Sequence, residues 1–104
     1  MPIITAIKGP AAGIGMTLSL MGDIVIASES AYFLQAFRNV GLIPDGGITW
    51  LLPRLIGLAR SMELSLLAER LPALKALEWG LINRVVPDND LLPEALKMAE
   101  NLAA

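Results

Sequence analysis

Hydrophobic and polar positions along the first third of the chain predict strands around one short helix. β-Branched residues dominate residues 3–7, and this run ends at Lys8-Gly9-Pro10, as a buried strand entering a turn does. Apolar residues recur over residues 15–21, which predicts a short buried helix. Two more apolar runs, residues 23–27 and 32–34, predict further strands. The order strand, helix, strand is typical of a layered α/β fold.

The rest of the chain follows mainly the helical period, with one strand predicted over residues 82–86. Pro53 lies inside the first of the predicted helices and lacks an N–H, so we expect a kink or a break there. Asn89 or Asp90 is expected to cap the last helix. The helices are predicted over residues 49–56, 58–68, 74–79 and about 90–103.

The composition of the chain indicates contact with further polypeptide. Apolar residues make up 55% of the 104 residues and charged residues only 17%, which is much apolar surface for one modest core. We therefore expect part of that surface to contact a partner subunit or another part of the same fold. The net charge of −2, without a clustered basic face, argues against a nucleic-acid partner.

Neither a membrane span nor a secretory signal is predicted. The most apolar stretch, residues 14–27, is interrupted by Gly22 and Asp23. Residues 1–4 lack the basic region of a signal peptide. The chain has no cysteine, which excludes disulfides and thiolate zinc sites and fits a cytoplasmic protein.

The absence of histidine and cysteine narrows the candidates for proton transfer to carboxylates, lysines and Tyr32. Asp45 is the strongest of these, because Pro44 fixes the backbone before it and two glycines free the backbone after it. A positioned acid between apolar segments suits acid–base chemistry. An aspartate that only hydrogen-bonds its own turn is the ordinary alternative.

A second candidate is the loop of small residues 9–15, which contains three glycines and precedes the first predicted helix. Backbone N–H groups near Ile14 or Gly15 would be unpaired there and would suit an oxyanion hole. Phosphate binding is disfavoured, because the spacing is neither G-x-G-x-x-G nor a Walker loop. A close-packed turn without a ligand explains the same glycines.

Three ordered segments together resemble the crotonase (enoyl-CoA hydratase/isomerase) superfamily over essentially all 104 residues. The resemblance implies the ββα spiral core of that family in a single partial crotonase-like domain, residues 1–104, truncated at both ends. Family members are much longer, and the chain corresponds to their middle portion. The segments that carry the resemblance are residues 3–15 with 22–27, residues 41–54 around Leu42-Ile43-Pro44-Asp45, and residues 76–86.

The resemblance also implies roles for individual residues. The second of two backbone donors to a thioester carbonyl matches the Ile14 N–H. The two glutamates of hydratases correspond to Thr17 and Phe37, neither of which transfers protons in the required way. Asp45 matches the working aspartate of several isomerases and of a dehalogenase. The implied substrate-binding residues are Ala12, Gly13, Gly15, Thr17, Phe37, Pro44 and Trp50.

These correspondences favour an acyl-CoA isomerase, with most similarity to isomerases that act on a ring epoxide of a CoA ester. An enoyl-CoA hydratase, a dehalogenase-like hydrolase and a non-catalytic oligomerising module remain alternatives. The family implies a homo-oligomer, a trimer or hexamer, and an acyl-CoA substrate. No separate cofactor or metal is expected, since coenzyme A is part of the substrate. Whether the chain is active by itself is left open.

Overall fold

The computed structural model describes residues 1–35 and 48–104. One sheet contains three parallel strands in the order β1-β3-β6, with Ile4 opposite Ile24 and Ile26 opposite Arg84. Val25, Ile26 and Ala27 of its central strand are buried, because helices pack against this sheet. Their bounds are β1 (Ile4–Ile7), β3 (Ile24–Ser28) and β6 (Arg84–Val86).

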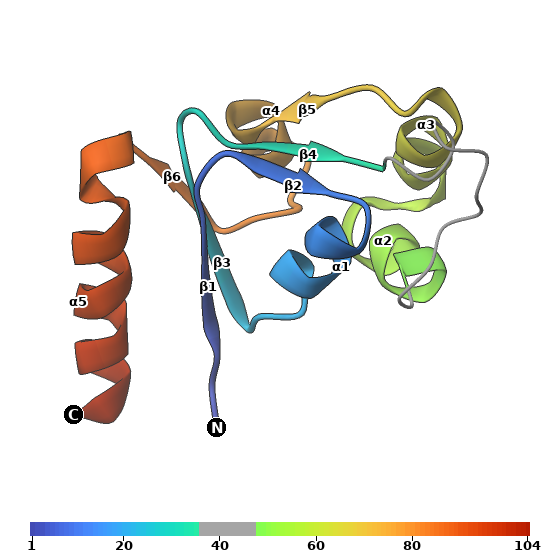
Figure 1. Cartoon of the computed structure of the whole chain (residues 1–104). Helices are drawn as coiled ribbons and strands as arrows, with labels where there is room; N and C mark the ends of the chain where they lie inside the picture. The colour runs from blue at the N-terminus through green and yellow to red at the C-terminus, as the bar shows by residue number, and fades with distance from the viewer. Residues whose placement is uncertain (36–47) are drawn as a thin grey trace.

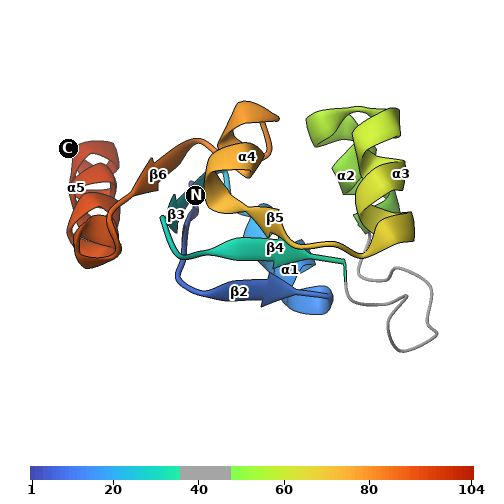
Figure 2. The ribbon, with the colours of Figure 1, turned by 90° about the horizontal axis from the view of Figure 1, so that it is seen from above.

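A second, smaller sheet crosses the end of the first one (Figures 1 and 2). Its order is β2-β4-β5, in which β2 and β4 are parallel and β5 is antiparallel to β4. Ala11 lies opposite Phe33, which lies opposite Leu71, and all three side chains are buried. The strands are β2 (Pro10–Ala12), β4 (Tyr32–Leu34) and β5 (Leu71–Pro72).

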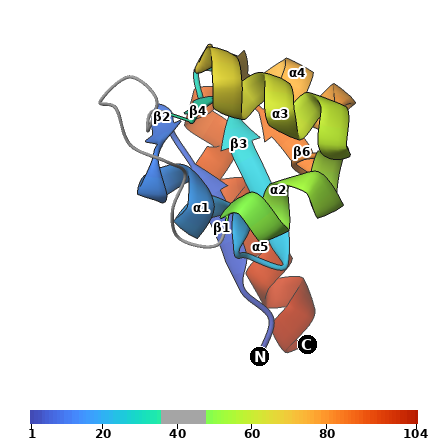
Figure 3. The same ribbon diagram turned by 90° about the vertical axis from the view of Figure 1, so that its right-hand side faces the viewer.

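Helices pack around these sheets in two groups. The last helix lies alongside β1 and β3, while α2 and α3 form a pair at the opposite end of the molecule and face the viewer in Figure 3. The short α1 connects β2 to β3 and contributes Met16 to the core. The helices are α1 (Ile14–Leu20), α2 (Ile48–Ile56), α3 (Leu58–Leu67), α4 (Ala73–Glu78) and α5 (Leu91–Ala103).

The core lies where α1, the second sheet and α2 meet. Its largest fully buried apolar side chains include Phe33, Met16 and Leu52. Burying a side chain of this size contributes about 1.5–3 kcal/mol. The predicted α/β layers are therefore confirmed, together with the main predicted helices and strands.

The structure differs from the sequence predictions at several places. Strands β2 and β5 were not predicted, because Pro10-Ala11-Ala12 and Leu71-Pro72 lack a β-branched pattern. Pro53 does not break its helix, which runs from Ile48 to Ile56, so of the expected kink or break the break is excluded. Asp90 precedes α5 but makes no side-chain capping hydrogen bond, because the chain enters α5 from a 3₁₀ turn over Asp88–Asp90.

Gly22 lets the chain after α1 pass close to β1. A Cβ atom at Gly22 would overlap Thr5 Oγ1 and lie 3.1 Å from Thr5 Cβ. Nearby, the Asp23 carboxylate accepts a hydrogen bond from the Ile3 N–H at 2.8 Å, which gives Asp23 a structural role at the start of the sheet. These contacts fix the register in which β3 begins.

Within residues 1–35 and 48–104, no helix is long and apolar enough to cross a membrane.

Candidate active site

The site is centred on the corner between β2 and α1. Gly13 occupies this corner with φ 55° and ψ −125°, a conformation that side-chain-bearing residues rarely adopt. Its N–H donates a hydrogen bond to the Leu34 carbonyl at 2.9 Å, which joins the corner to the end of β4. Its carbonyl accepts from the Met16 N–H at 3.1 Å and from the Thr17 N–H at 3.4 Å, so Gly13 starts the helix.

Ile14 and Gly15 follow in the first turn of α1, where backbone N–H groups have no partner inside the helix. Among the described residues, no group accepts a hydrogen bond from either N–H. The Ile14 side chain is 49% exposed, and Ala12 before the corner is exposed as well. The Gly15 carbonyl accepts the Ser19 hydroxyl at 2.7 Å, which ties down the same turn. The corner thus presents backbone donors on an accessible surface.

Thr17 lies one turn further along α1 and is completely buried. A threonine hydroxyl is neither an acid nor a base near neutral pH, so it cannot take over the proton transfer of a carboxylate. Since Met16 is fully buried as well, this side of α1 belongs to the core.

Gln35 is a polar residue of this region that the sequence did not single out. It follows β4 directly after Leu34, which pairs with Ala12, and its side chain is 1% exposed. Neither oxygen nor nitrogen of its carboxamide has a hydrogen-bond partner among the described residues. An unpaired buried amide costs about 1–3 kcal/mol. The sequence pattern that could have indicated burial of Gln35 is its position two residues after Phe33, on the same side of the strand.

Trp50 lies away from the Gly13 corner. It is 61% exposed on α2 and lines a pocket of about 610 Å³ with Leu20 and Met21, which lie at the opposite end of α1. The seven residues of α1 span about 10 Å at 1.5 Å per residue. Arg54 lies over the Trp50 ring at 4.0 Å and donates to the Trp50 carbonyl at 2.8 Å. Trp50 therefore lines a pocket at the end of α1 opposite Ile14.

Three predicted site residues, Phe37, Pro44 and Asp45, lie outside the described residues. The described chain stops at Gln35, beside the corner, and resumes at Ile48 on α2. The structure therefore places Ala12, Gly13, Ile14, Gly15 and Thr17 together, and Trp50 apart from them.

Charged groups of the described residues lie mostly away from the Gly13 corner. Neither end of α1 carries a charged residue in its terminal turn. No group of three or more histidine, cysteine, aspartate or glutamate residues suited to a metal ion occurs in the described ranges. The pKa of Asp88 is lowered, chiefly because Ser30 donates hydrogen bonds to its carboxylate, including one from the Ser30 N–H at 3.1 Å. That pair fastens β6 to the turn after β3.

Sequence and structure comparisons relate this chain to known proteins. The sequence profile described as enoyl-CoA hydratase/isomerase matches residues 1–104. The chain is 55% identical over 102 residues to the 1,2-epoxyphenylacetyl-CoA isomerase of Escherichia coli, covering 98% of the chain and 39% of that protein. It is 50% identical over 90 residues to a probable enoyl-CoA hydratase of Rhodobacter capsulatus, covering 86% of the chain and 35% of that protein.

A solved structure agrees with the sequence comparisons. The chain superimposes on an enoyl-CoA hydratase/isomerase from Pseudoalteromonas atlantica with a TM-score of 0.96 and 43% identity. That match covers all of this chain and 42% of the solved one. The chain thus spans about two-fifths of the length of these relatives, and over that span its fold is that of the solved structure.

Proposed function

The chain belongs to the enoyl-CoA hydratase/isomerase family, and we propose that it supplies the catalytic segment of an acyl-CoA isomerase. In this proposal the Ile14 N–H binds the thioester carbonyl oxygen, and Asp45 moves a proton between two carbons of the acyl group. The observation that carries the proposal is the Gly13 corner, where accessible N–H groups follow a fixed left-handed glycine.

The proposed chemistry follows from polarising the thioester. Negative charge builds on the carbonyl oxygen when the α-carbon loses a proton, and an N–H aimed at that oxygen stabilises the charge. The Asp45 carboxylate accepts the proton from one carbon and returns it to another. Atoms balance without added water, because the same proton is removed and redelivered while the double bond moves.

The residues at the two hydratase positions favour isomerisation over hydration. Adding water across a double bond employs two proton-transfer groups, one to activate water and one to protonate carbon. Thr17 offers only a buried hydroxyl, and Phe37 offers no ionisable group. Asp45 is then the remaining acid of the proposed site, and a single base suffices for double-bond migration.

Substrate and assembly are part of the same proposal. We expect an acyl-CoA, with coenzyme A as part of the substrate and no separate cofactor, in a cytoplasmic homo-oligomer, a trimer or hexamer. The exposed pocket beside Trp50, lined by Leu20, Met21 and Leu55, suits an apolar surface of a partner or an acyl group.

The test places this chain in a complete enzyme. In the E. coli 1,2-epoxyphenylacetyl-CoA isomerase, the stretch matched by this chain is replaced by the chain itself, and turnover is compared with that of Asp45→Asn. We expect kcat to fall about 10²-fold to 10⁴-fold, the usual contribution of a general acid–base group. Binding of acetyl-CoA, measured by calorimetry, should stay within about twofold, since the substitution is nearly isosteric.

The matched control is Asp90→Asn, which removes an exposed acid before α5 and should leave kcat unchanged. Retention of full turnover by Asp45→Asn would remove Asp45 from the mechanism. A dehalogenase-like hydrolase would instead use Asp45 as nucleophile. Its carboxylate would displace halide from a substrate carbon, and the ester between that carbon and Asp45, trapped on quenching, would identify this reaction.

A non-catalytic oligomerising module is the second candidate, favoured by the many large apolar side chains that are exposed. These include Leu18, Met21, Leu58 and Leu66, each at least half exposed. Binding of acetyl-CoA to the isolated chain separates the two functions. Micromolar binding contradicts a purely structural module, whereas absent binding together with concentration-dependent assembly supports it.

A further inference from the structure

Gln35 is a buried side chain whose hydrogen-bonding groups have no partner. It is 1% exposed, and neither Nε2 nor Oε1 has a hydrogen-bond partner among the described residues. Ser28 is also fully buried, but its hydroxyl lies 3.3 Å from that of Ser30. Folded proteins pair the large majority of their buried polar side-chain atoms, so the unpaired amide requires an explanation. A ligand bound beside Gln35 would supply the missing partner.

The pairing of β2 with β4 places Gln35 beside the Gly13 corner. Ala12 lies opposite Leu34, and the Gly13 N–H donates to the Leu34 carbonyl at 2.9 Å. Gly13 and Gln35 are the next residues along the two segments. Neighbouring strands lie about 4.8 Å apart, so the backbone of Gln35 is about one strand spacing from that of Gly13. A glutamine side chain is long enough to bridge this distance.

The Gln35 side chain lies on the face of β4 that α1 covers. Side chains alternate between the two faces of a strand, so Gln35 is on the same face as Phe33. Phe33 and Met16 of α1 belong to the same buried cluster. The carboxamide is therefore on the side of the sheet where α1 begins. There the Ile14 and Gly15 N–H groups have no acceptor among the described residues, so backbone donors and a side-chain amide both remain unpaired at one corner.

A ligand at this corner satisfies the amide only if it carries a second polar atom. In the proposed function, the Ile14 N–H binds the thioester carbonyl oxygen. The β-carbon of the acyl group lies close to that oxygen, because only the α-carbon separates it from the carbonyl carbon. A hydrocarbon chain leaves the Gln35 amide unpaired, whereas an oxygen on the β-carbon accepts a hydrogen bond from Nε2. A site built to hydrogen-bond one ligand group rejects the analogue that lacks it.

We propose that Gln35 is a specificity-determining residue, which selects acyl-CoA substrates with a hydroxyl or cyclic ether oxygen on the β-carbon over hydrocarbon acyl chains. Its Nε2 donates to that oxygen, and its Oε1 accepts from a hydroxyl when one is present. The inference rests on the proposed function, because it uses the thioester position set by the Ile14 N–H. It adds a substrate class to that function, and Gln35 takes no part in making or breaking bonds.

Equilibrium binding to the chimera of the E. coli isomerase that contains this chain tests the selection without turnover. Calorimetry compares 3-hydroxybutyryl-CoA with butyryl-CoA, which lacks the β-oxygen. We expect the hydroxylated ligand to bind at least about fivefold more tightly, and Gln35→Met, similar in size but without an N–H donor, to remove most of that preference. A chimera without the preference, or an unchanged preference in Gln35→Met, overturns the proposal. Retained turnover by Asp45→Asn would instead overturn the proposed function and leave this comparison intact.

Unfolding of the 104-residue chain distinguishes a ligand contact from a structural one. Because the amide has no partner among the described residues, replacing it with methionine removes a buried polar group without loss of a hydrogen bond to them. We expect Gln35→Met to unfold at the same urea concentration as the unchanged chain or at a higher one. Unfolding at a lower concentration would show that the carboxamide holds the fold together, and it would overturn the proposal.

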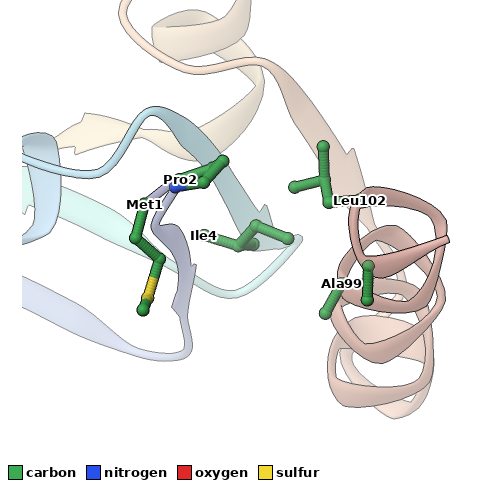
Figure 4. Close-up of a pocket in the computed structure, with 6 residues that line it drawn as sticks. Met1, Pro2, Ile4, Ala99 and Leu102 are labelled. Carbon is green, nitrogen blue, oxygen red and sulfur yellow. The ribbon is translucent and has the colours of Figure 1, made fainter.

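The matched control is Leu102→Met, which introduces a methionine on the other side of the first sheet from α1 (Figure 1). Leu102 lines an apolar groove of about 380 Å³ between the start of β1 and α5, together with Pro2, Ile4 and Ala99 (Figure 4). Since these side chains carry no hydrogen-bonding group, Leu102→Met should leave the affinity ratio of the two CoA esters unchanged. A ratio altered equally by both substitutions would overturn selection by Gln35.

Discussion

Ile14 enters the proposed site through its backbone, so its N–H and its side chain can be separated by mutation. It is the first residue of α1, directly after Gly13. Proline is well tolerated at the first position of a helix, where the N–H has no helical partner. A proline there removes the proposed oxyanion donor while it preserves the start of α1.

In the chimeric enzyme, Ile14→Pro is expected to lower kcat about 10²-fold to 10³-fold, the usual effect of removing one oxyanion donor. Ile14→Ala keeps the N–H and should retain activity within about threefold, since the side chain is half exposed. Steady-state kinetics of the two variants checks this. Equal activities would show that the N–H does not stabilise the reacting oxygen.

Asp88 gives a residue-scale prediction about pH. Its pKa is lowered in the folded chain by hydrogen bonds from Ser30, so the carboxylate favours folding above its unfolded pKa of about 3.9. This contribution is lost as pH falls from about 4 through the lower folded pKa. Asp88→Asn should therefore flatten the acid limb of the unfolding free energy, measured by urea titration at several pH values. Asp90→Asn, two residues away, is the control and should keep the steeper limb.

Prediction from sequence at the residue scale succeeded where backbone chemistry is local. Glycines before a helix indicated unpaired N–H groups near Ile14 or Gly15, and the structure has a helix start at that corner. Gln35 could not be found in this way, because burial of its carboxamide without a partner among the described residues depends on tertiary packing. The distance of Trp50 from the corner likewise depends on how α2 packs against α1.

At the scale of elements, the junction of α1 and β3 depends on the close approach of Gly22 to Thr5. A Cβ at Gly22 has no space, since Thr5 Cβ and the Thr5 N lie 3.1 and 3.3 Å from its position. Gly22→Ala should therefore destabilise the fold by about 1–3 kcal/mol, as overpacking usually does. Chemical denaturation measures this, and Thr5→Ala in the same chain should recover part of the loss. A neutral Gly22→Ala would show that β1 and β3 need no such contact.

Helices and strands were predictable where the apolar pattern is strong. The short strands β2 and β5 were missed. The helix over residues 91–103 has a clear apolar face, and the β-branched runs of β1 and β3 have their expected type. Strands β2 and β5 are built from alanine, proline and leucine; both pair with β4, and α1 and α4 contact them. Their strand geometry comes from tertiary context, which local propensity does not contain.

At the scale of the whole molecule, the chain forms a folded core that relatives extend with further polypeptide. Its matched stretch covers 39% of the E. coli isomerase. The apolar excess noted in the composition lies on the surface at residues such as Leu18, Leu74 and Leu96. These exposed side chains account for an apolar content that one small core cannot bury.

The central claim, isomerisation rather than hydration, is tested most directly by isotopic labelling. The chimeric enzyme, in which positions 14, 17, 37 and 45 all come from this chain, is incubated with an enoyl-CoA in ¹⁸O-water, and the product is analysed by mass spectrometry. We predict that the double bond migrates and that the product contains no ¹⁸O. Formation of a hydroxyacyl-CoA that carries one ¹⁸O atom would contradict the claim, because hydration would then proceed with Thr17 and Phe37 at the two hydratase positions.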